Sequence, residues 1–322
     1  MTTAIDRGER PARNHATWIL AGLAACIAWP AAPALAQSPG IVGVVAPESQ
    51  VELVQEGFVF TEGPLGAEDG SLYFSDVRAS KTYHLGLDGK ITLVREQTGG
   101  GNGLALAPGG DLLTAEGDAK RITRRTRDGT VTVLTESIAN KPLFAPNDLI
   151  LDAKGGVYFT DPGPRPVVPG RPTYVGYLPP GAKEAIVLDG TVARPNGLTL
   201  TLDGKTLIVD DTIGLDVFAY DVQPDGGVAN KRVFARLRDI PDGKESGADG
   251  LAIDNAGRIY ISTLTGVQIF DAKGEYLGTI KVPRQPANVA FAGPDKSTLY
   301  ITAREGLYRV KLLAKGPDRV GK

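Results

Sequence analysis

Six oxygen-bearing side chains recur at similar spacing along the sequence, and their chemistry is that of a metal site. Two are carboxylates and four are amides, with no histidine or cysteine among them. Such hard oxygen ligands suit Ca²⁺, or Mg²⁺ and Mn²⁺ with more water retained, and they suit zinc and copper poorly. The six residues are Glu62, Asn102, Asn147, Asn196, Asp249 and Asn288.

Each of these residues opens one copy of a repeated hairpin. The starts of neighbouring copies lie 39 to 53 residues apart, which suits four short strands per copy. Such a repeat predicts an all-β protein, a six-bladed β-propeller with four-stranded antiparallel blades. The alternative, a pair of β-sandwiches, gives no reason to repeat one hairpin. The copies read EGPLGAEDGSLYFSD (62–76), NGLALAPGGDLLTAE (102–116), NDLILDAKGGVYFTD (147–161), NGLTLTLDGKTLIVD (196–210), DGLAIDNAGRIYIST (249–263) and NVAFAGPDKSTLYIT (288–302).

The fold predicted from the repeat would bring the six opening residues together. In a propeller the innermost strand of each blade lines the central channel, so equivalent positions face one point at its mouth. The alternative is that each residue caps a turn, since Asn and Asp bond readily to nearby backbone. Six equivalent positions favour a shared site.

The N-terminal segment has the layout of a secretory signal peptide. Residues 1–36 have three arginines near their start, at positions 7, 10 and 13. An apolar stretch over 16–29 follows, and the segment ends in small residues, which predicts cleavage after Ala36. The alternatives are a membrane anchor, for which the apolar stretch is short, and a lipoprotein modified at Cys26. We expect the protein to be exported, either periplasmic or secreted, with residues 37–322 forming a single propeller domain.

Composition excludes several other chemistries. The chain has one cysteine, Cys26, so the predicted mature protein has neither disulfides nor a thiol nucleophile. After removal of the predicted signal peptide, the mature chain has one histidine, His84, which makes a histidine-based triad improbable. The net charge is −2 and no basic stripe is visible, which argues against nucleic acid as a partner. No second apolar segment is long enough for a membrane helix, and the oligomeric state is open.

Four hairpin openings and the last hairpin together resemble the gluconolactonase and regucalcin (senescence marker protein) family. The similarity spans the chain from about residue 50 to 312. Any one motif is weak, but the set in this order is specific. The matching stretches are EGP (62–64), PND (146–148), RPNGL (194–198), DGLAID (249–254) and NVAFAGPDKSTLYIT (288–302).

This resemblance implies a propeller with a divalent cation, usually calcium, at the channel mouth and hydrolysis of sugar-acid lactones. It implies that the cation is held by Glu62, Asn147, Asn196 and Asp249. Mg²⁺, Mn²⁺ or Zn²⁺ could replace calcium in an assay. In animal members a basic residue that meets the substrate stands two positions before the third-blade Asn, whereas this chain has Ala145. That difference puts recognition of a sugar acid in doubt.

A carboxylate must remove a proton from the attacking water. Asp249 is the first candidate for this general base, as the resemblance implies, and Asp148 is the second. The residues expected to contact a small lactone substrate are Asn102, Asn147, Asp148 and Asn288.

Two loops and three acidic residues complete the expectations. Residues 161–180 are rich in proline and would form either a lid or a connection, and 241–249 could place Glu245 or Ser246 over the pocket. Each acidic residue ends the second strand of its hairpin and is expected a strand's length from the opening residues. These three are Glu116, Asp161 and Asp210.

Three functions are consistent with these patterns. The principal one is an exported, metal-dependent lactonase. The second is an esterase or a phosphotriesterase-like hydrolase that uses the same centre. The third is a non-catalytic propeller that binds a ligand and keeps its ion for structure, because a fold alone does not establish catalysis.

Overall fold

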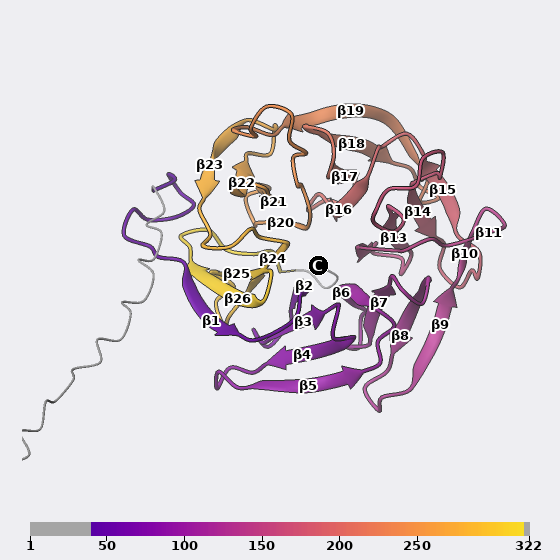
Figure 1. Cartoon of the computed structure of the whole chain (residues 1–322), viewed down its shortest axis with the longest axis horizontal. Helices are drawn as coiled ribbons and strands as arrows, with labels where there is room; N and C mark the ends of the chain where they lie inside the picture. Colours follow the sequence, from indigo (N-terminus) through magenta and orange to yellow (C-terminus); the bar gives the residue numbers. More distant parts are fainter. Residues whose placement is uncertain (1–39, 319–322) are drawn as a thin grey trace, which may run out of the picture. The chain divides into compact units, whose positions relative to one another are not determined.

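The computed structural model describes residues 40–318, which form six four-stranded antiparallel sheets in a ring (Figure 1). The predicted six-bladed propeller is therefore confirmed. The described range contains no helix, and so none long and apolar enough to cross a membrane. The predicted signal peptide, residues 1–36, lies outside the described residues, as does the lipoprotein alternative at Cys26.

Each blade is one sheet of four strands, ordered from the innermost to the outermost. Blade 1 contains β2 (Thr61–Gly66), β3 (Leu72–Asp76), β4 (Lys81–Leu85) and β5 (Ile91–Glu96), and blade 2 contains β6 (Gly101–Leu106), β7 (Leu112–Glu116), β8 (Arg121–Arg125) and β9 (Val131–Thr135). Blade 3 contains β12 (Leu149–Leu151), β13 (Val157–Asp161), β14 (Tyr174–Leu178) and β15 (Ile186–Asp189), and blade 4 contains β16 (Pro195–Leu200), β17 (Thr206–Asp211), β18 (Asp216–Val222) and β19 (Val228–Arg236). Blade 5 contains β20 (Leu251–Ile253), β21 (Ile259–Thr263), β22 (Gly266–Phe270) and β23 (Tyr276–Ile280), and blade 6 contains β24 (Asn288–Ala292), β25 (Thr298–Ala303), β26 (Gly306–Lys311) and β1 (Glu52–Glu56). A separate two-stranded ribbon joins β10 (Ser137–Ile138) to β11 (Lys141–Pro142).

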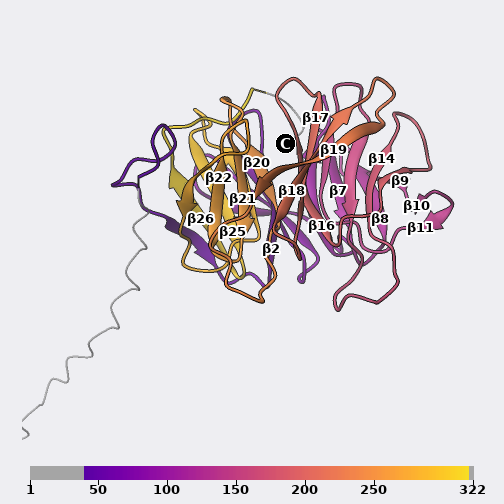
Figure 2. The same cartoon turned by 90° about the horizontal axis from the view of Figure 1, so that it is seen from above.

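Burial falls from the inner strands to the outer ones. All six residues of β16 are buried, whereas three of the five residues of β9 are exposed. An inner strand is covered by both neighbouring blades, so it consists of apolar or internally bonded residues. Seen edge-on, the strands run between the two faces of the ring (Figure 2). The two ends of each inner strand therefore lie at the two mouths of the channel.

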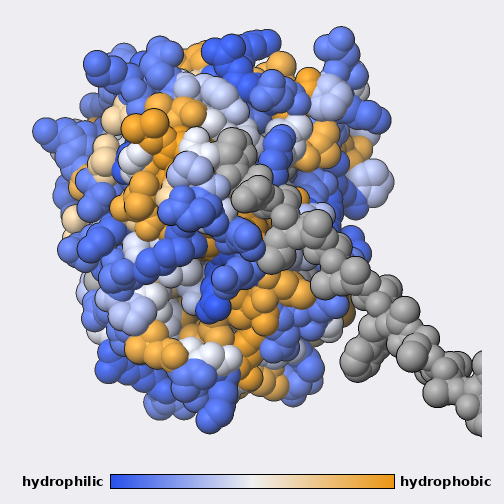
Figure 3. Space-filling view, turned by 90° about the vertical axis from the view of Figure 1, so that its left-hand side faces the viewer, coloured by the Kyte–Doolittle hydropathy of each residue, from blue (hydrophilic) through white to orange (hydrophobic). Residues whose placement is uncertain are grey.

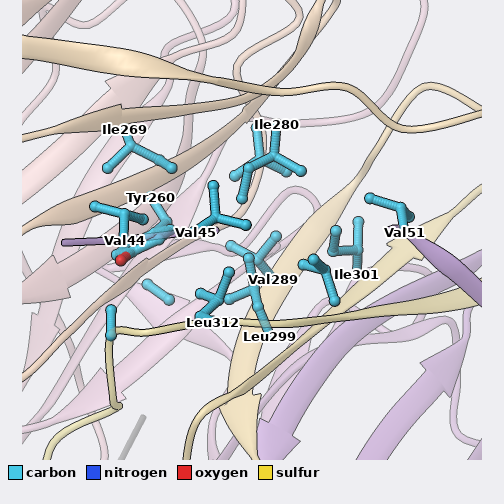
Figure 4. Close-up of a cluster of buried hydrophobic side chains, with 14 of the residues drawn as sticks. Val44, Val45, Val51, Tyr260, Ile269, Ile280, Val289, Leu299, Ile301 and Leu312 are labelled. Carbon is cyan, nitrogen blue, oxygen red and sulfur yellow. The ribbon is translucent and has the colours of Figure 1, made fainter. Parts of the chain in front are cut away.

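Apolar side chains fill the wedges between neighbouring blades. In the wedge between blades 5 and 6, Tyr260 and Ile269 pack with Val289 and Ile301, and Val51 joins from the chain before β1 (Figure 4). All five side chains are at most 1% exposed. Similar clusters lie between other blades, so the protein has a core distributed around the ring.

The N-terminal strand closes the ring. β1 pairs antiparallel with β26, with Glu52 opposite Arg309 and Leu53 opposite Tyr308. Blade 6 thus takes three strands from the end of the chain and its outer strand from the beginning. The side of the ring seen in Figure 3 is mostly hydrophilic, with several separate groups of hydrophobic residues.

Candidate active site

One cavity gathers most of the residues that open the hairpins. It has a volume of about 540 Å³ and lies at the channel mouth formed by the starts of the inner strands. Five of the six opening residues line it: Glu62, Asn102, Asn147, Asn196 and Asp249. The structure therefore brings together all four predicted metal ligands and two of the four predicted substrate contacts.

The opening residues leave the regular ladder of their strands. The register shifts after Glu62 in β2, across Asn102 in β6 and across Asn196 in β16, as in a β-bulge. Asn147 and Asp249 stand two residues before β12 and β20 begin. A bulge or a strand end turns a side chain away from the sheet, and such irregularities are common beside active sites. This explains how poor strand formers come to head apolar strands.

The glycine after an opening residue allows neighbouring blades to approach closely. A β-carbon at Gly63 would stand 2.0 Å from the carbonyl oxygen of Asn102, closer than any side chain allows. Gly63 also has a φ of +46°, which favours glycine. The recurring Glu-Gly, Asn-Gly and Asp-Gly pairs thus place a functional side chain beside the contact that holds two blades together.

Two amide oxygens in the cavity lack hydrogen-bond donors. Asn196 is 6% exposed, and its Nδ2 donates to Thr212 Oγ1 at 3.1 Å, which leaves its Oδ1 buried without a partner. Asn102 Oδ1 is likewise buried and unpaired. A buried acceptor without a donor is costly unless a ligand satisfies it. A cation would do so.

Asp249 is a carboxylate of this cavity whose pKa is perturbed by burial and by its neighbours. Burial raises its pKa well above the usual 3.8, and the negative charges of Glu62, Asp210 and Asp148 raise it further. Arg304 opposes the shift. Glu62 itself is 3% exposed. Two buried carboxylates that repel each other at the mouth of a channel are expected where a cation is bound.

Two of the predicted site residues lie outside the cavity lining. Asp148 is 1% exposed, and its Oδ1 accepts a 2.9 Å hydrogen bond from the Leu149 amide. Asn288 is also 1% exposed, and its Oδ1 accepts a 2.8 Å bond from the Val289 amide. The negative charge of Asp148 nevertheless acts on the site, because it raises the pKa of Asp249. Substrate contact by Asp148 and Asn288 stays a prediction.

The expected position of the acidic strand-end residues was wrong. Glu116 pairs with Gly101 at the start of β6, and Asp161 accepts a 2.7 Å bond from the Ala145 amide just before β12. Because antiparallel strands fold back, the last residue of the second strand lies opposite the first residue of the first. These carboxylates therefore stand at the same end of the blades as the opening residues.

Asp210 differs from the other two strand-end residues. It is fully buried, its Oδ1 accepts a 3.1 Å bond from the Gly197 amide, and its charge raises the pKa of Asp249. In blade 4 it is the next residue, Asp211, that pairs with the strand start at Pro195. Because β16 is bulged, the carboxylates of both Asp210 and Asp211 lie at the end of blade 4 where β16 begins. The hairpin alignment did not indicate this pair.

Loops within and between the blades supply the rest of the lining. Glu245 and Ser246 were the two residues expected over the pocket from loop 241–249. Glu245 lines the cavity, whereas Ser246 is buried and its hydroxyl donates to the Asp211 carbonyl. The proline-rich segment contains β14 and, before it, a loop whose Arg165 pairs with Glu245 at 3.0 Å. Sequence reasoning missed a set of basic lining residues because they lie on loops outside the repeat: Arg78, Arg165, Arg194, Lys244 and Arg304.

The donor set fits a hard divalent cation. Within residues 40–318 no three His, Cys, Asp or Glu side chains are grouped so as to bind a metal ion. The cavity instead offers the carboxylates of Glu62 and Asp249 with amide oxygens, two of which lack donors. Such a mixture of charged and neutral oxygens is typical of calcium ligands. Zinc and copper prefer thiolate or imidazole ligands instead.

The fold and the cavity define a six-bladed propeller with an oxygen-lined pocket at one mouth of its channel. Residues 60–305 match the model of the SMP-30/Gluconolactonase/LRE-like region, and the chain belongs to this family. It is 26% identical over 303 residues to a gluconolactonase of Zymomonas mobilis, covering 85% of this chain and 84% of the relative.

Solved structures agree with this assignment. A gluconolactonase from Xanthomonas campestris is 30% identical, with a TM-score of 0.74 over 82% of this chain and 90% of that one. A calcium-binding regucalcin from Agrobacterium tumefaciens is 20% identical, with a TM-score of 0.71 over 83% and 95%, and this likeness shows the fold alone. The gluconolactonase and lactonase relatives support a lactone-hydrolysing enzyme.

Proposed function

We propose that the protein is an exported hydrolase of sugar lactones that depends on a divalent cation, with calcium as the first candidate. One observation in particular supports the proposal that the enzyme depends on a metal. The unpaired oxygen of Asn196 shares a cavity with the carboxylates of Glu62 and Asp249. A bound cation would satisfy that oxygen and offset the charge at once, whereas the unpaired oxygen of Asn102 is left to accept a hydrogen bond from the substrate.

The residues that would hold the cation are Glu62, Asn147, Asn196 and Asp249. When bound, the cation supplies a Lewis acid for the lactone carbonyl, where negative charge develops as water adds. Asp249 lies in the same cavity and would accept the proton of that water as general base. The ring C–O bond then breaks, and the same proton passes to the departing ring oxygen to give the open hydroxy acid.

Export is the second part of the proposal. It is supported by the basic start, the apolar stretch and the small residues of segment 1–36. Expression of the full chain in a bacterial host followed by N-terminal sequencing of the exported protein tests it. We expect a mature chain that begins at Gln37. An unprocessed chain in the cytoplasmic fraction would contradict export.

Lactone hydrolysis releases acid, so a pH-stat assay tests the enzymatic part directly. We expect turnover of γ- or δ-lactones by protein whose calcium content has been measured by elemental analysis. EDTA should abolish the turnover, and calcium should restore it. Turnover that survives complete metal removal would contradict the metal dependence. Full metal occupancy without turnover of any lactone or ester would favour a ligand-binding propeller instead.

A further inference from the structure

The cavity carries more positive charge than a neutral sugar lactone needs. Five basic residues line it, and we refer to them together as the basic arc: Arg78, Arg165, Arg194, Lys244 and Arg304. Of these five residues, only Arg165 has an ion-pair partner within residues 40–318, which is Glu245 at 3.0 Å. The acidic residues of the lining are Glu245, Glu62 and Asp249, and the buried carboxylates of Asp148 and Asp210 also act on Asp249. With the proposed divalent cation bound, the positive charges of the basic arc and the cation still outnumber these five carboxylates.

Arg194 is a buried member of the basic arc with hydrogen-bonding capacity left over. It is 7% exposed, and its two Nη atoms donate to the carbonyls of Pro162 and Gly163 at 3.3 Å each. Its Nε is buried and has no partner. A buried guanidinium is expensive unless an anion compensates it. The negative charges of Asp249, Glu245 and Asp211 act on Arg194, but no carboxylate of the described residues lies within ion-pair distance, so the guanidinium has no direct anionic partner.

Arg304 and Arg78 contact the same aromatic ring of the lining, that of Phe60. Their guanidinium carbons lie 5.5 Å and 5.2 Å from the ring centroid of Phe60. Arg304 also donates to Gln285 Oε1, which fixes its position. A guanidinium stacked on a ring keeps its edge available for hydrogen bonds to a planar or tetrahedral anion. Arg304 is thus held in place beside the cavity, where its charge acts on Asp249, but no carboxylate of the described residues lies within ion-pair distance of it.

We propose that the natural substrate is a lactone that carries a second, anionic group, which Arg194 and Arg304 bind. This inference rests on the proposed lactonase function and adds the substrate class to it. The monolactone of a sugar dicarboxylic acid and a lactone with a phosphate ester share the required chemistry. The charge would also explain how a sugar acid is recognised in a chain that has Ala145 and no basic side chain at that position.

Matched lactones test the charge. Glucono-1,4-lactone and glucaro-1,4-lactone differ only at the terminal carbon, C6, which is an alcohol in the first and a carboxylate in the second. We expect kcat/KM to be about tenfold higher for the glucaric lactone, as hydrogen bonds to charged groups allow. A phosphate ester of gluconolactone forms the third arm, and its rank against the carboxylate identifies which anion the site prefers.

Variants assign the preference to residues. Arg304→Gln should lower the ratio of anionic to neutral kcat/KM about tenfold, and Arg194→Lys should lower it because a lysine lacks the Nε donor and the planar fork. Arg236→Gln is the matched control, since Arg236 is an exposed outer-strand residue paired with Asp216. Thermal unfolding of each variant shows whether the fold is kept.

The two proposals fail in different ways. Hydrolysis of all lactones at equal rates, or a ratio that Arg304→Gln and Arg194→Lys leave unchanged in folded protein, overturns the anionic substrate and leaves the lactonase standing. Absence of any hydrolysis overturns the lactonase. In that event calorimetric binding of glucarate and gluconate decides the inference. Tighter binding of glucarate that depends on Arg304 supports it, and equal binding overturns it.

Discussion

Gly197 lies directly against the carbonyl of Asp249. A β-carbon at Gly197 would stand 2.1 Å from that oxygen, and Gly197 N donates to Asp210 Oδ1 at 3.1 Å. The residue after one predicted metal ligand is therefore packed against the backbone of another. The positions of Asn196 and Asp249 are coupled through this contact, so the geometry of the site depends on the packing of blade 4 against blade 5.

Gly197→Ala should consequently impair both stability and activity. The added methyl group must push the Asp249 backbone away, and overpacking of this kind costs about 1–3 kcal/mol. We expect a lower urea midpoint, weaker calcium binding and reduced lactone turnover. Gly190→Ala is the control, since a β-carbon there meets only the Thr173 carbonyl at 3.6 Å. Equal behaviour of the two variants would show that the contact does not position Asp249.

Asn196→Asp should strengthen cation binding about tenfold, because a third carboxylate joins Glu62 and Asp249 in the cavity. The same change should destabilise the metal-free protein, since the new charge adds to the repulsion there. Calcium titration calorimetry and urea unfolding in EDTA measure the two effects. Asn255→Asp, at an exposed position away from the cavity, is the control. Unaltered calcium affinity would exclude Asn196 from the ligand set.

The pKa of Asp249 predicts how stability varies with pH in the metal-free protein. Because the folded-state pKa lies above 3.8, the folded protein binds more protons than the unfolded one at pH values between the two. The contribution of Asp249 to stability therefore falls as pH rises from about 4 through its folded-state pKa. Urea unfolding in EDTA across about pH 4–8 should show this loss.

Two comparisons assign that slope to Asp249. Asp249→Asn removes the titrating group and should flatten the slope between the same pH values. Saturating calcium should also flatten it, because a cation compensates the carboxylate charge that destabilises the folded state. A slope that persists in Asp249→Asn would have to come from other groups.

The repeat in the sequence was enough to predict the ring of blades and the cavity at its mouth. The period of the hairpin gives the blades, and the opening residues are polar where a buried strand would be apolar. Asn102 and Asp249 could therefore be assigned to one cavity from their equivalent places in the repeat. Their exact surroundings depend on bulges such as the one across Asn196, which no pattern of residue types announces.

The basic arc was not predictable by the same reasoning. Arg165 and Lys244 lie on loops whose length differs from blade to blade, so nothing in the repeat relates them. Arg194 was part of a recognised motif, RPNGL, but its burial and its unpaired Nε appear only in three dimensions. Under the proposed anionic substrate, specificity would depend on the parts of the chain that vary between blades, while the repeated part supplies the predicted centre.

Closure of the ring by β1 also carries no repeat signal, because its partner β26 lies at the other end of the chain. We expect burial to contribute more to this closure than charge does. Val51→Ala should cost about 2 kcal/mol, since Val51 is fully buried in the wedge between blades 5 and 6. Arg309→Gln removes an exposed pair with Glu52 at 2.9 Å and should cost less than about 1 kcal/mol. Urea unfolding of both variants measures the difference, and a larger loss in Arg309→Gln would show that the ion pair holds the ring closed.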